Sequence, residues 1–269
     1  MRVSFLDQTF KCNICGALNE TVNAIPHREL LHCSNCGSCA RFRGIAKAIL
    51  LDVLQGNGSE TLADQPNRSD ICGIGMSDAD CYANCLDSLF NYTNTYYHTD
   101  PCLDITDRES SMQFQNLDFV ISSDVLEHVH APVSSALINV HNMLKPGGKL
   151  ILTVPYVEGY ETIEHFPHLL AYEIAKLGDT YVLVNQRADG QVEMHQNLSF
   201  HGGPGSVLEL RIFGEGDLFA TLASAGFNSI SVLVPDDAAI GYFWEEHIEN
   251  PLTKGRRNKS YVMVCTRDF

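Results

Sequence analysis

The clearest pattern of hydrophobic and polar positions lies in the middle of the chain. Residues 117–122 are mostly apolar, as in a strand that is buried on both faces of a sheet. Pro132 can occupy the first turn of a helix, and apolar side chains then recur at helical spacing from Val133 to Leu144. Pro146-Gly147-Gly148 ends that helix, and residues 150–154 predict the next strand. Two buried strands joined by a helix predict a parallel α/β sheet, which binds ligands at the carboxyl ends of its strands.

Weaker patterns on either side add further elements. Residues 70–75 predict a first strand, residues 79–90 a helix, and residues 96–100 a second strand. Residues 157–215 carry few helical signals and contain a predicted hairpin, so they form a β-rich insertion. The closing part of the chain predicts a helix and two last strands, over residues 217–225, 228–234 and 260–266.

Length and charge limit the kinds of partner. The chain has 269 residues, which is room for one large domain or for one domain and a small module. Its formal net charge is −15, but residues 1–47 hold six Lys/Arg against three Asp/Glu, a net charge of +3, which leaves −18 for the remainder. An acidic body repels nucleic acid and anionic membrane surfaces. We therefore expect neither a membrane partner nor a nucleic-acid substrate, unless the amino-terminal part engages one.

Cysteine usage points to a reducing compartment. The first residues lack the apolar segment of a secretory signal, and no stretch approaches the length of a membrane span. We therefore expect a cytoplasmic protein whose ten cysteines are thiols or metal ligands rather than disulfides. The oligomeric state cannot be derived from the sequence.

Two Cys-x-x-Cys pairs near the amino terminus predict a metal site. Cys12 and Cys15 are separated from Cys33 and Cys36 by seventeen residues, a spacing typical of zinc ribbons. His32 and Cys39 are alternative ligands that fit the paired pattern less well. Four thiolates leave no open position on the metal, so the predicted zinc is structural. We assign residues 1–43 to a zinc-ribbon-like module and residues 44–269 to the main domain. Arg41 and Arg43 have two possible roles: they contact an acidic partner or a phosphate, or they pack the module against that domain.

The middle of the chain resembles a known family. The motifs D-x-V-x-x-x-x-V-L-E-H-V, from Asp118, and L-K-P-G-G-x-L-x-x-x-V-P, from Leu144, are similar to the fourth and fifth strands of class I S-adenosylmethionine-dependent methyltransferases. Most of the chain is also similar to bacterial methyltransferases of type 11 that carry an amino-terminal cysteine motif, through the GIGMSD turn, the YYHTDPCLDIT and EHFPHL segments and the FHGGPGS loop. This resemblance implies a Rossmann-like fold with a mostly parallel seven-stranded sheet, whose last two strands pair as an antiparallel hairpin. It implies S-adenosylmethionine as the cofactor.

The resemblance also implies where the cofactor binds. The family carries an acidic residue and a G-x-G-x-G loop after the first strand, where this chain has a degenerate loop in which Ser77 and Ala79 replace two glycines. An acidic residue after the second strand binds ribose, and another binds adenine. Ser122, Ser123 and Asp124 are expected to line the floor. The cofactor-binding candidates are Gly73, Gly75, Met76, Ser77, Asp100, Asp104, Ser122, Ser123 and Asp124.

The acceptor side carries the candidate general bases. Glu127 and His128 follow the fourth strand of the family pattern, near where a methyl acceptor would lie. In the insertion, His165 and His201 are the further candidates, and His201 precedes a glycine-rich loop. A metal bound by Glu164, His165 and His168 is an alternative, although their spacing matches no strong metal motif. His128, His165 and His201 are therefore the predicted catalytic residues.

Methyl transfer to a small-molecule or saccharide acceptor is the function that these patterns favour. The first alternative is an RNA methyltransferase, which the net charge of +3 in residues 1–47 permits and the acidic body opposes. The second is a non-catalytic interaction protein whose degenerate loop no longer holds the cofactor. An NAD-dependent oxidoreductase fits less well, because Asp78 stands at the third glycine of G-x-G-x-x-G.

Overall fold

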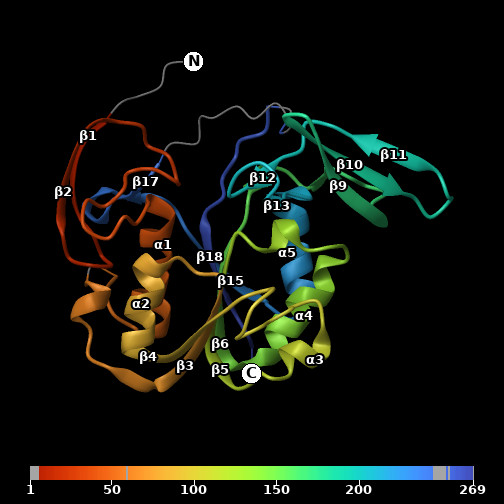
Figure 1. The fold of residues 1–269 in the computed structure, drawn as a ribbon. Coiled ribbons are helices and arrows are strands. Elements are labelled where there is room, and N and C mark those ends of the chain that lie inside the picture. The colour runs from red at the N-terminus through yellow and green to blue at the C-terminus, as the bar shows by residue number, and fades with distance from the viewer. Residues whose placement is uncertain (1–5, 59, 245–252, 254, 269) are drawn as a thin grey trace.

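The computed structural model describes residues 6–58, 60–244, 253 and 255–268, and its centre is a six-stranded sheet in the order β15-β18-β6-β5-β3-β4 (Figure 1). In chain order its strands are β3 (Arg68–Met76), β4 (Phe90–Thr95), β5 (Leu117–Ser123), β6 (Leu144–Thr153), β15 (Ser229–Leu233) and β18 (Val262–Thr266). β4, β3, β5 and β6 are parallel neighbours, whereas β18 is antiparallel to both β6 and β15. The predicted parallel α/β sheet and its antiparallel last hairpin are confirmed.

Helices cover both faces of this sheet. The α-helices are α1 (Ala40–Ala48), α2 (Asp80–Leu89), α3 (Arg108–Ser111), α4 (Val133–Met143) and α5 (Glu215–Ser224), and shorter turns are η1 (Ile49–Val53, a π-helix), η2 (Leu62–Asp64) and η3 (Leu126–His128). Figure 1 shows α1 and α2 on one side and α4 and α5 on the other. Successive side chains of a strand point to opposite faces. Phe119 and Ile121 of β5 accordingly join the hydrophobic cluster beneath α1 and α2, and Val120 joins the cluster beneath α4 and α5.

The prediction of a seven-stranded sheet is wrong for the described residues, because one edge strand is missing. The predicted second strand, residues 96–100, is not a strand: Tyr96 forms an isolated bridge with Cys102, residues 97–100 are bends, and the strand that pairs with β3 is β4. The aromatic run Tyr96-Tyr97 has high β-propensity, but both side chains are exposed, whereas Phe90 and Tyr92 are buried and fix β4 in the sheet. Only the one-turn helix α3 lies between β4 and β5. β4 is therefore the edge strand, and the region that follows it is abbreviated.

The amino-terminal segment packs against the central sheet. β1 (Leu6–Lys11) and β2 (Leu18–Ala24) make an antiparallel hairpin beside α1 (Figure 1). Phe10 and Ile14 belong to the same hydrophobic cluster as Ile121 and Ile151 of the central sheet. Helix α1 runs across the boundary that the sequence suggested at residue 43. The described residues up to 43 thus contribute to the same hydrophobic core as the central sheet.

The insertion between β6 and α5 is built of short strands. It contains β7 (Tyr156–Val157), β8 (Ile163–Glu164), β9 (Ala171–Leu177), β10 (Thr180–Gln186), β11 (Val192–His195), β12 (Phe200–His201), β13 (Val207–Leu208) and β14 (Arg211–Gly214). β9, β10 and β11 form an antiparallel sheet that projects from the body in Figure 1 and includes the predicted hairpin. β14 pairs with β7 and β8 and returns the chain to the core. The predicted β-rich insertion is confirmed.

Between β15 and β18 the chain returns to α1. β16 (Asp236–Asp237), η4 (Ala238–Ile240) and β17 (Tyr242–Phe243) lie there, and Tyr242 and Trp244 are buried in the cluster beneath α1 and α2. Each helix in the described ranges is too short or too polar to traverse a lipid bilayer.

Candidate functional site

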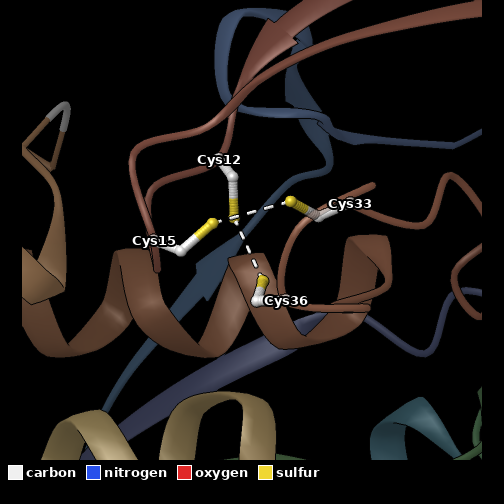
Figure 2. A group of neighbouring side chains, drawn as sticks. All are labelled: Cys12, Cys15, Cys33 and Cys36. Atoms are coloured by element: carbon white, nitrogen blue, oxygen red, sulfur yellow. Dashed lines mark hydrogen bonds between the residues drawn. The ribbon is translucent and has the colours of Figure 1, made fainter.

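The four cysteines of the two Cys-x-x-Cys pairs lie together. Cys12 and Cys15 follow β1, Cys33 and Cys36 precede α1, and their sulfur atoms converge in Figure 2. The Sγ atoms of Cys12 and Cys36 are 3.7 Å apart, those of Cys15 and Cys33 are 3.6 Å apart, and all four lie within 4.8 Å of one another. Sulfurs bound at about 2.3 Å in a tetrahedron around one zinc ion lie about 3.8 Å apart. The donor set and its spacing therefore fit a closed zinc site.

Two backbone turns of the same design hold these thiols. In each turn, the glycine that follows the second cysteine donates its N–H to the carbonyl of the first, at 2.8 Å from Gly16 to Cys12 and 2.9 Å from Gly37 to Cys33. Gly16 and Gly37 have φ angles of 78° and 75°, a region that favours glycine. The hydrogen bond with the Cys36 thiol lowers the pKa of Cys12 to about 4, and the same contact raises the pKa of Cys36. Cys12 is therefore already suited to bind metal as a thiolate.

A buried arginine lies beside the cysteine cluster. Arg43 is fully buried and donates hydrogen bonds to the carbonyl oxygens of Ser38, Leu31 and Gly241. Burial lowers its pKa, and the nearby cysteine thiolates oppose this shift. A zinc ion held by four thiolates would carry a net negative charge, which the Arg43 guanidinium would offset. The prediction that Arg43 packs the amino-terminal segment against the rest of the chain is confirmed.

The loop after β3 is fastened to β4. Asp78 donates its backbone N–H to the Asn94 side chain at 2.9 Å, and its carboxylate accepts a hydrogen bond from the Tyr92 hydroxyl at 2.6 Å. Burial raises the pKa of Asp78 to about 6, against the hydrogen bond from Tyr92. A Cβ atom on Gly75 would lie 1.9 Å from the Asp78 carboxylate, and one on Gly73 would lie 2.2 Å from the Phe119 ring. Both glycines thus make room for protein groups, a role that their place in the family pattern did not suggest.

The end of β5 is joined to the amino-terminal segment by ion pairs. The Asp124 carboxylate lies 2.8 Å from Arg28 and 3.5 Å from Arg41, and Arg41 also donates a hydrogen bond to the Ser123 hydroxyl. Burial opposes ionisation, but Arg28 and Arg41 outweigh it and lower the pKa of Asp124. Glu29 accepts hydrogen bonds from Arg41 at 2.6 and 3.0 Å. Two of the floor residues, Ser123 and Asp124, are therefore in contact with residues 28–41.

The remaining cofactor-binding candidates lie near the same edge of the sheet. The parallel pairing of Gly75 with Ile121 places Met76 and Ser77 beside Ser122 and Ser123. Ser77 is exposed, and the Ser122 hydroxyl is buried without a hydrogen-bond partner in the described structure. Asp100 and Asp104 lie in the loop after β4; Asp100 is exposed, and Asp104 accepts hydrogen bonds from the Thr106 backbone and hydroxyl.

The three predicted catalytic histidines lie in one cluster. The rings of His128 and His201 approach through Nε2 and Nδ1 at 3.0 Å, and His128 Nδ1 lies 2.7 Å from the Leu208 carbonyl oxygen. His165 and His201 both contact the Glu209 carboxylate, at 2.8 and 2.9 Å. Burial opposes ionisation, but the hydrogen bonds from His165 and His201 lower the pKa of Glu209 to about 2. Burial lowers the pKa of His128.

Glu127 lies beside these histidines and has a different environment from Glu209. Its side chain is fully buried, and burial, together with the charge of Asp124, raises its pKa well above the usual range. Glu164 instead pairs with Arg211 at 2.8 Å, and His168 is exposed, so the alternative metal site at Glu164, His165 and His168 is not formed. Sequence reasoning missed Glu209, Arg28 and Glu29, because no local pattern pairs them with their partners. Arg28 meets Asp124 across 96 residues, Glu209 meets His165 across 44, and Glu29 meets Arg41 across 12.

Comparison with known proteins identifies the family. Residues 51–152 match the family model described as "Methyltransferase domain", and this stretch contains β3, α2, β4, β5, α4 and nearly all of β6. The chain therefore contains a methyltransferase domain over these residues. The match covers the parallel strands whose carboxyl ends carry the candidate cofactor site, so the recognition from the two sequence motifs is confirmed. A search of curated proteins finds no match.

Solved methyltransferase structures are distantly similar to the chain. A S-adenosylmethionine-dependent methyltransferase from Clostridium acetobutylicum is 12% identical, with a TM-score of 0.39, and the alignment covers 73% of this chain and 83% of that one. The sugar N-methyltransferase KedS8 from Streptoalloteichus is 12% identical, with a TM-score of 0.40 and coverage of 74% and 81%. The amino pentose methyltransferase CalS10 from Micromonospora echinaspora is 14% identical, with a TM-score of 0.41 and coverage of 90% and 100%. Similarities this distant do not identify an acceptor.

Proposed function

We propose that the protein transfers the methyl group of S-adenosylmethionine to a small polar acceptor of the saccharide or small-metabolite type. The observation that carries this proposal is the carboxyl edge of β3 and β5, which lies inside the matched domain and retains polar groups for a ligand. Ser122 has a buried hydroxyl without a hydrogen-bond partner among the described residues, and Ser77 is exposed next to it. These groups fit a ligand that lies across the two strand ends.

The residues at this edge take separate roles in the proposal. Ser122 and the backbone of Met76 and Ser77 hold the middle of the cofactor, and the loop that carries Asp100 and Asp104 holds its adenosine end. Ser123 and Asp124 act indirectly, because their contacts with Arg41 and Arg28 fix the wall of the site. When bound, the cofactor supplies an activated methyl group, so the chain itself needs chiefly to position the acceptor and exclude water.

The histidine cluster gives the acceptor side its polar chemistry. His201 is the most exposed of the three predicted bases, with 35% of its side chain accessible against 13% for His128 and 10% for His165. An acceptor that enters from solvent would therefore meet His201 first. Glu209 holds His165 and His201 in place through its two carboxylate oxygens.

We also propose that the four cysteines hold a structural zinc ion. The spacing of the sulfur atoms, the paired glycine turns and the compensating charge of Arg43 support this assignment. Four protein ligands leave no position for a substrate, so this ion takes no part in the chemistry.

The basic residues of the amino-terminal segment bear on the RNA alternative. Arg28 pairs with Asp124, Arg41 with Glu29, and Lys47 with Asp237 at 2.8 Å. Arg43 is buried. Charges that are neutralised inside the fold contribute little to a phosphate-binding surface. These four basic residues therefore do not form a basic surface patch. This absence of a patch among them favours a small acceptor over RNA.

Transfer of a radiolabelled methyl group tests the proposed acceptor class. Incubation with labelled S-adenosylmethionine and fractionated cell extract is expected to place the label in the small-molecule fraction, with little dependence on salt. RNA contacts made through Lys and Arg weaken steeply as salt rises. Methyl transfer to the RNA fraction at low salt, with a steep loss of this transfer at moderate salt, would contradict the proposal and favour the RNA alternative.

A further inference from the structure

A second group of metal-ligand side chains lies apart from the cysteines. Glu127 and His128 belong to η3, directly after β5, and His201 belongs to β12 of the insertion. Their nearest donor atoms form a triangle: His128 Nε2 to His201 Nδ1 is 3.0 Å, His201 Nδ1 to Glu127 Oε1 is 3.4 Å, and His128 Nε2 to Glu127 Oε1 is 3.8 Å. Ligands bound at about 2.0–2.2 Å to one ion lie about 3–3.6 Å apart. The triangle is therefore close to the size that a single ion requires.

The hydrogen bonds of the two imidazole rings leave a lone pair on each of the two facing nitrogen atoms. His128 Nδ1 is 2.7 Å from the Leu208 carbonyl, which can only accept, so this nitrogen carries the proton. His201 Nε2 is 2.9 Å from the Glu209 carboxylate and carries the proton for the same reason. In neutral rings, His128 Nε2 and His201 Nδ1 then present two lone pairs to each other at 3.0 Å. Two lone pairs at this distance repel unless a cation lies between them.

The Glu127 carboxylate is the independent observation that points to the same ion. Its side chain has 0% exposure, and neither oxygen has a hydrogen-bond partner among the described residues. Its contacts with the histidines, at 3.4 and 3.8 Å, are too long for hydrogen bonds. A buried carboxylate without a partner is strongly unfavourable. One proton shared by the two rings would satisfy only their two facing nitrogen atoms, whereas a metal ion would pair with all three groups.

The surrounding contacts hold the three groups in place. Glu209 accepts from His201 Nε2 and His165 Nε2, as second-shell carboxylates commonly do for metal-bound histidines. The Leu210 backbone N–H donates to the Glu127 carbonyl at 2.9 Å, which joins η3 to the insertion. The His201 side chain is 35% exposed, so one side of the triangle faces solvent. Three protein ligands with an open side are typical of a catalytic rather than a structural metal.

We infer that Glu127, His128 and His201 bind a divalent transition-metal ion, with open positions for water or an acceptor oxygen. Two imidazoles and one carboxylate suit zinc, cobalt, iron or manganese, whereas magnesium and calcium prefer oxygen ligands alone. Glu127 lies three residues after Asp124, so the ion would lie next to the carboxyl edge of β5. Its use in holding an acceptor hydroxyl rests on the proposed function; the binding of the ion does not.

Cobalt titration tests this inference without the cofactor. The protein, with its cysteine cluster loaded with zinc, is freed of weakly held metal and titrated with Co²⁺, which is followed by calorimetry and visible absorption. We expect one equivalent to bind, with the ligand-field bands of nitrogen and oxygen ligation and without sulfur charge-transfer bands. No uptake of Co²⁺, or uptake with sulfur charge-transfer bands alone, would overturn the inference.

Matched variants locate the site. Glu127→Gln and His201→Ala are expected to abolish Co²⁺ binding. Glu209→Gln is expected to weaken this binding about 10–100-fold. His168→Ala, at an exposed histidine of the same insertion, is expected to leave it unchanged. Glu127→Gln keeps the size of the side chain and leaves no ionisable group in this buried position, so its metal-free thermal midpoint should not fall below that of the wild type, and Co²⁺ should raise only the wild-type midpoint. Binding by Glu127→Gln and His201→Ala at wild-type strength would overturn the inference. Because no methyl donor is present, this outcome is separate from that of the proposed function.

Discussion

Replacing Cys15 by serine is expected to remove the zinc ion and to destabilise the whole chain rather than its first residues alone. The Cys15 sulfur lies 3.6 Å from that of Cys33, and a hydroxyl is a poor substitute for a thiolate ligand. Cys12 and Cys33 belong to the hydrophobic cluster that also contains Ile121 and Ile151 of the central sheet. Loss of the metal should therefore lower the free energy of unfolding by at least about 3–5 kcal/mol, since structural zinc supplies about 10 kcal/mol or more to isolated modules.

Metal analysis and urea unfolding measure this effect. The wild type should contain one zinc per chain and unfold in one transition, and a strong chelator should reproduce the behaviour of Cys15→Ser. Cys102→Ser is the matched control, because this exposed thiol lies outside the cluster. An unchanged unfolding midpoint in Cys15→Ser, or a wild type without zinc, would show that the four thiols have another role.

Asp124→Asn is expected to lower the free energy of unfolding by about 3–5 kcal/mol, the usual cost of removing one partner of a buried ion pair. Arg28 and Arg41 each have 12% of their side chains exposed, and Asp124 has 13%. Asn is the suitable replacement, since Asp124 has a φ of 55° that Asn also tolerates. The variant therefore removes the charge with little added backbone strain.

The pH dependence of this difference has a definite sign. The two arginines lower the pKa of Asp124 in the folded state, so its stabilising effect is fully present above its unfolded pKa of about 3.9. It is lost as the pH falls through the lower folded pKa. The difference in the free energy of unfolding between the wild type and Asp124→Asn should be largest above about pH 5 and should shrink below about pH 4. Asp118→Asn, in β5 at a partly exposed pair with Lys145 of β6, should cost at most about 1 kcal/mol. An equal cost for both variants would disprove the buried pair.

The parts that the sequence predicts well depend on local patterns. β5 and the second half of β6 are apolar runs, α4 has apolar residues at helical spacing, and each Cys-x-x-Cys pair specifies its own turn through the following glycine. The second strand was misplaced because Tyr96-Tyr97 and Phe90-Asn91-Tyr92 both have β-propensity, and only packing against Phe119 selects the latter. Burial, which fixes a strand, is not encoded in propensity.

The contacts that shape the candidate site depend on long-range packing. Arg28 meets Asp124 across 96 residues, and His128 meets His201 across 73. The sequence could nominate these histidines by residue type, but not the Glu209 carboxylate that holds two of them. It also could not show that the wall of the candidate cofactor site is formed in part by the amino-terminal segment, because that contact forms only when the sheet and the hairpin share one core.

Calorimetric titration with S-adenosylhomocysteine tests the central claim, that the ends of β3 and β5 hold the adenosyl cofactor. We predict saturable binding of one molecule per zinc-loaded chain. Ser122→Ala should weaken this binding about 2–10-fold through the loss of one hydrogen bond, whereas Ser224→Ala, at the far end of α5, should bind as the wild type does. Absence of binding heat with both S-adenosylhomocysteine and S-adenosylmethionine, in a wild type shown to be folded, would contradict the claim and favour a non-catalytic interaction protein whose loop is closed by Asp78 and Tyr92.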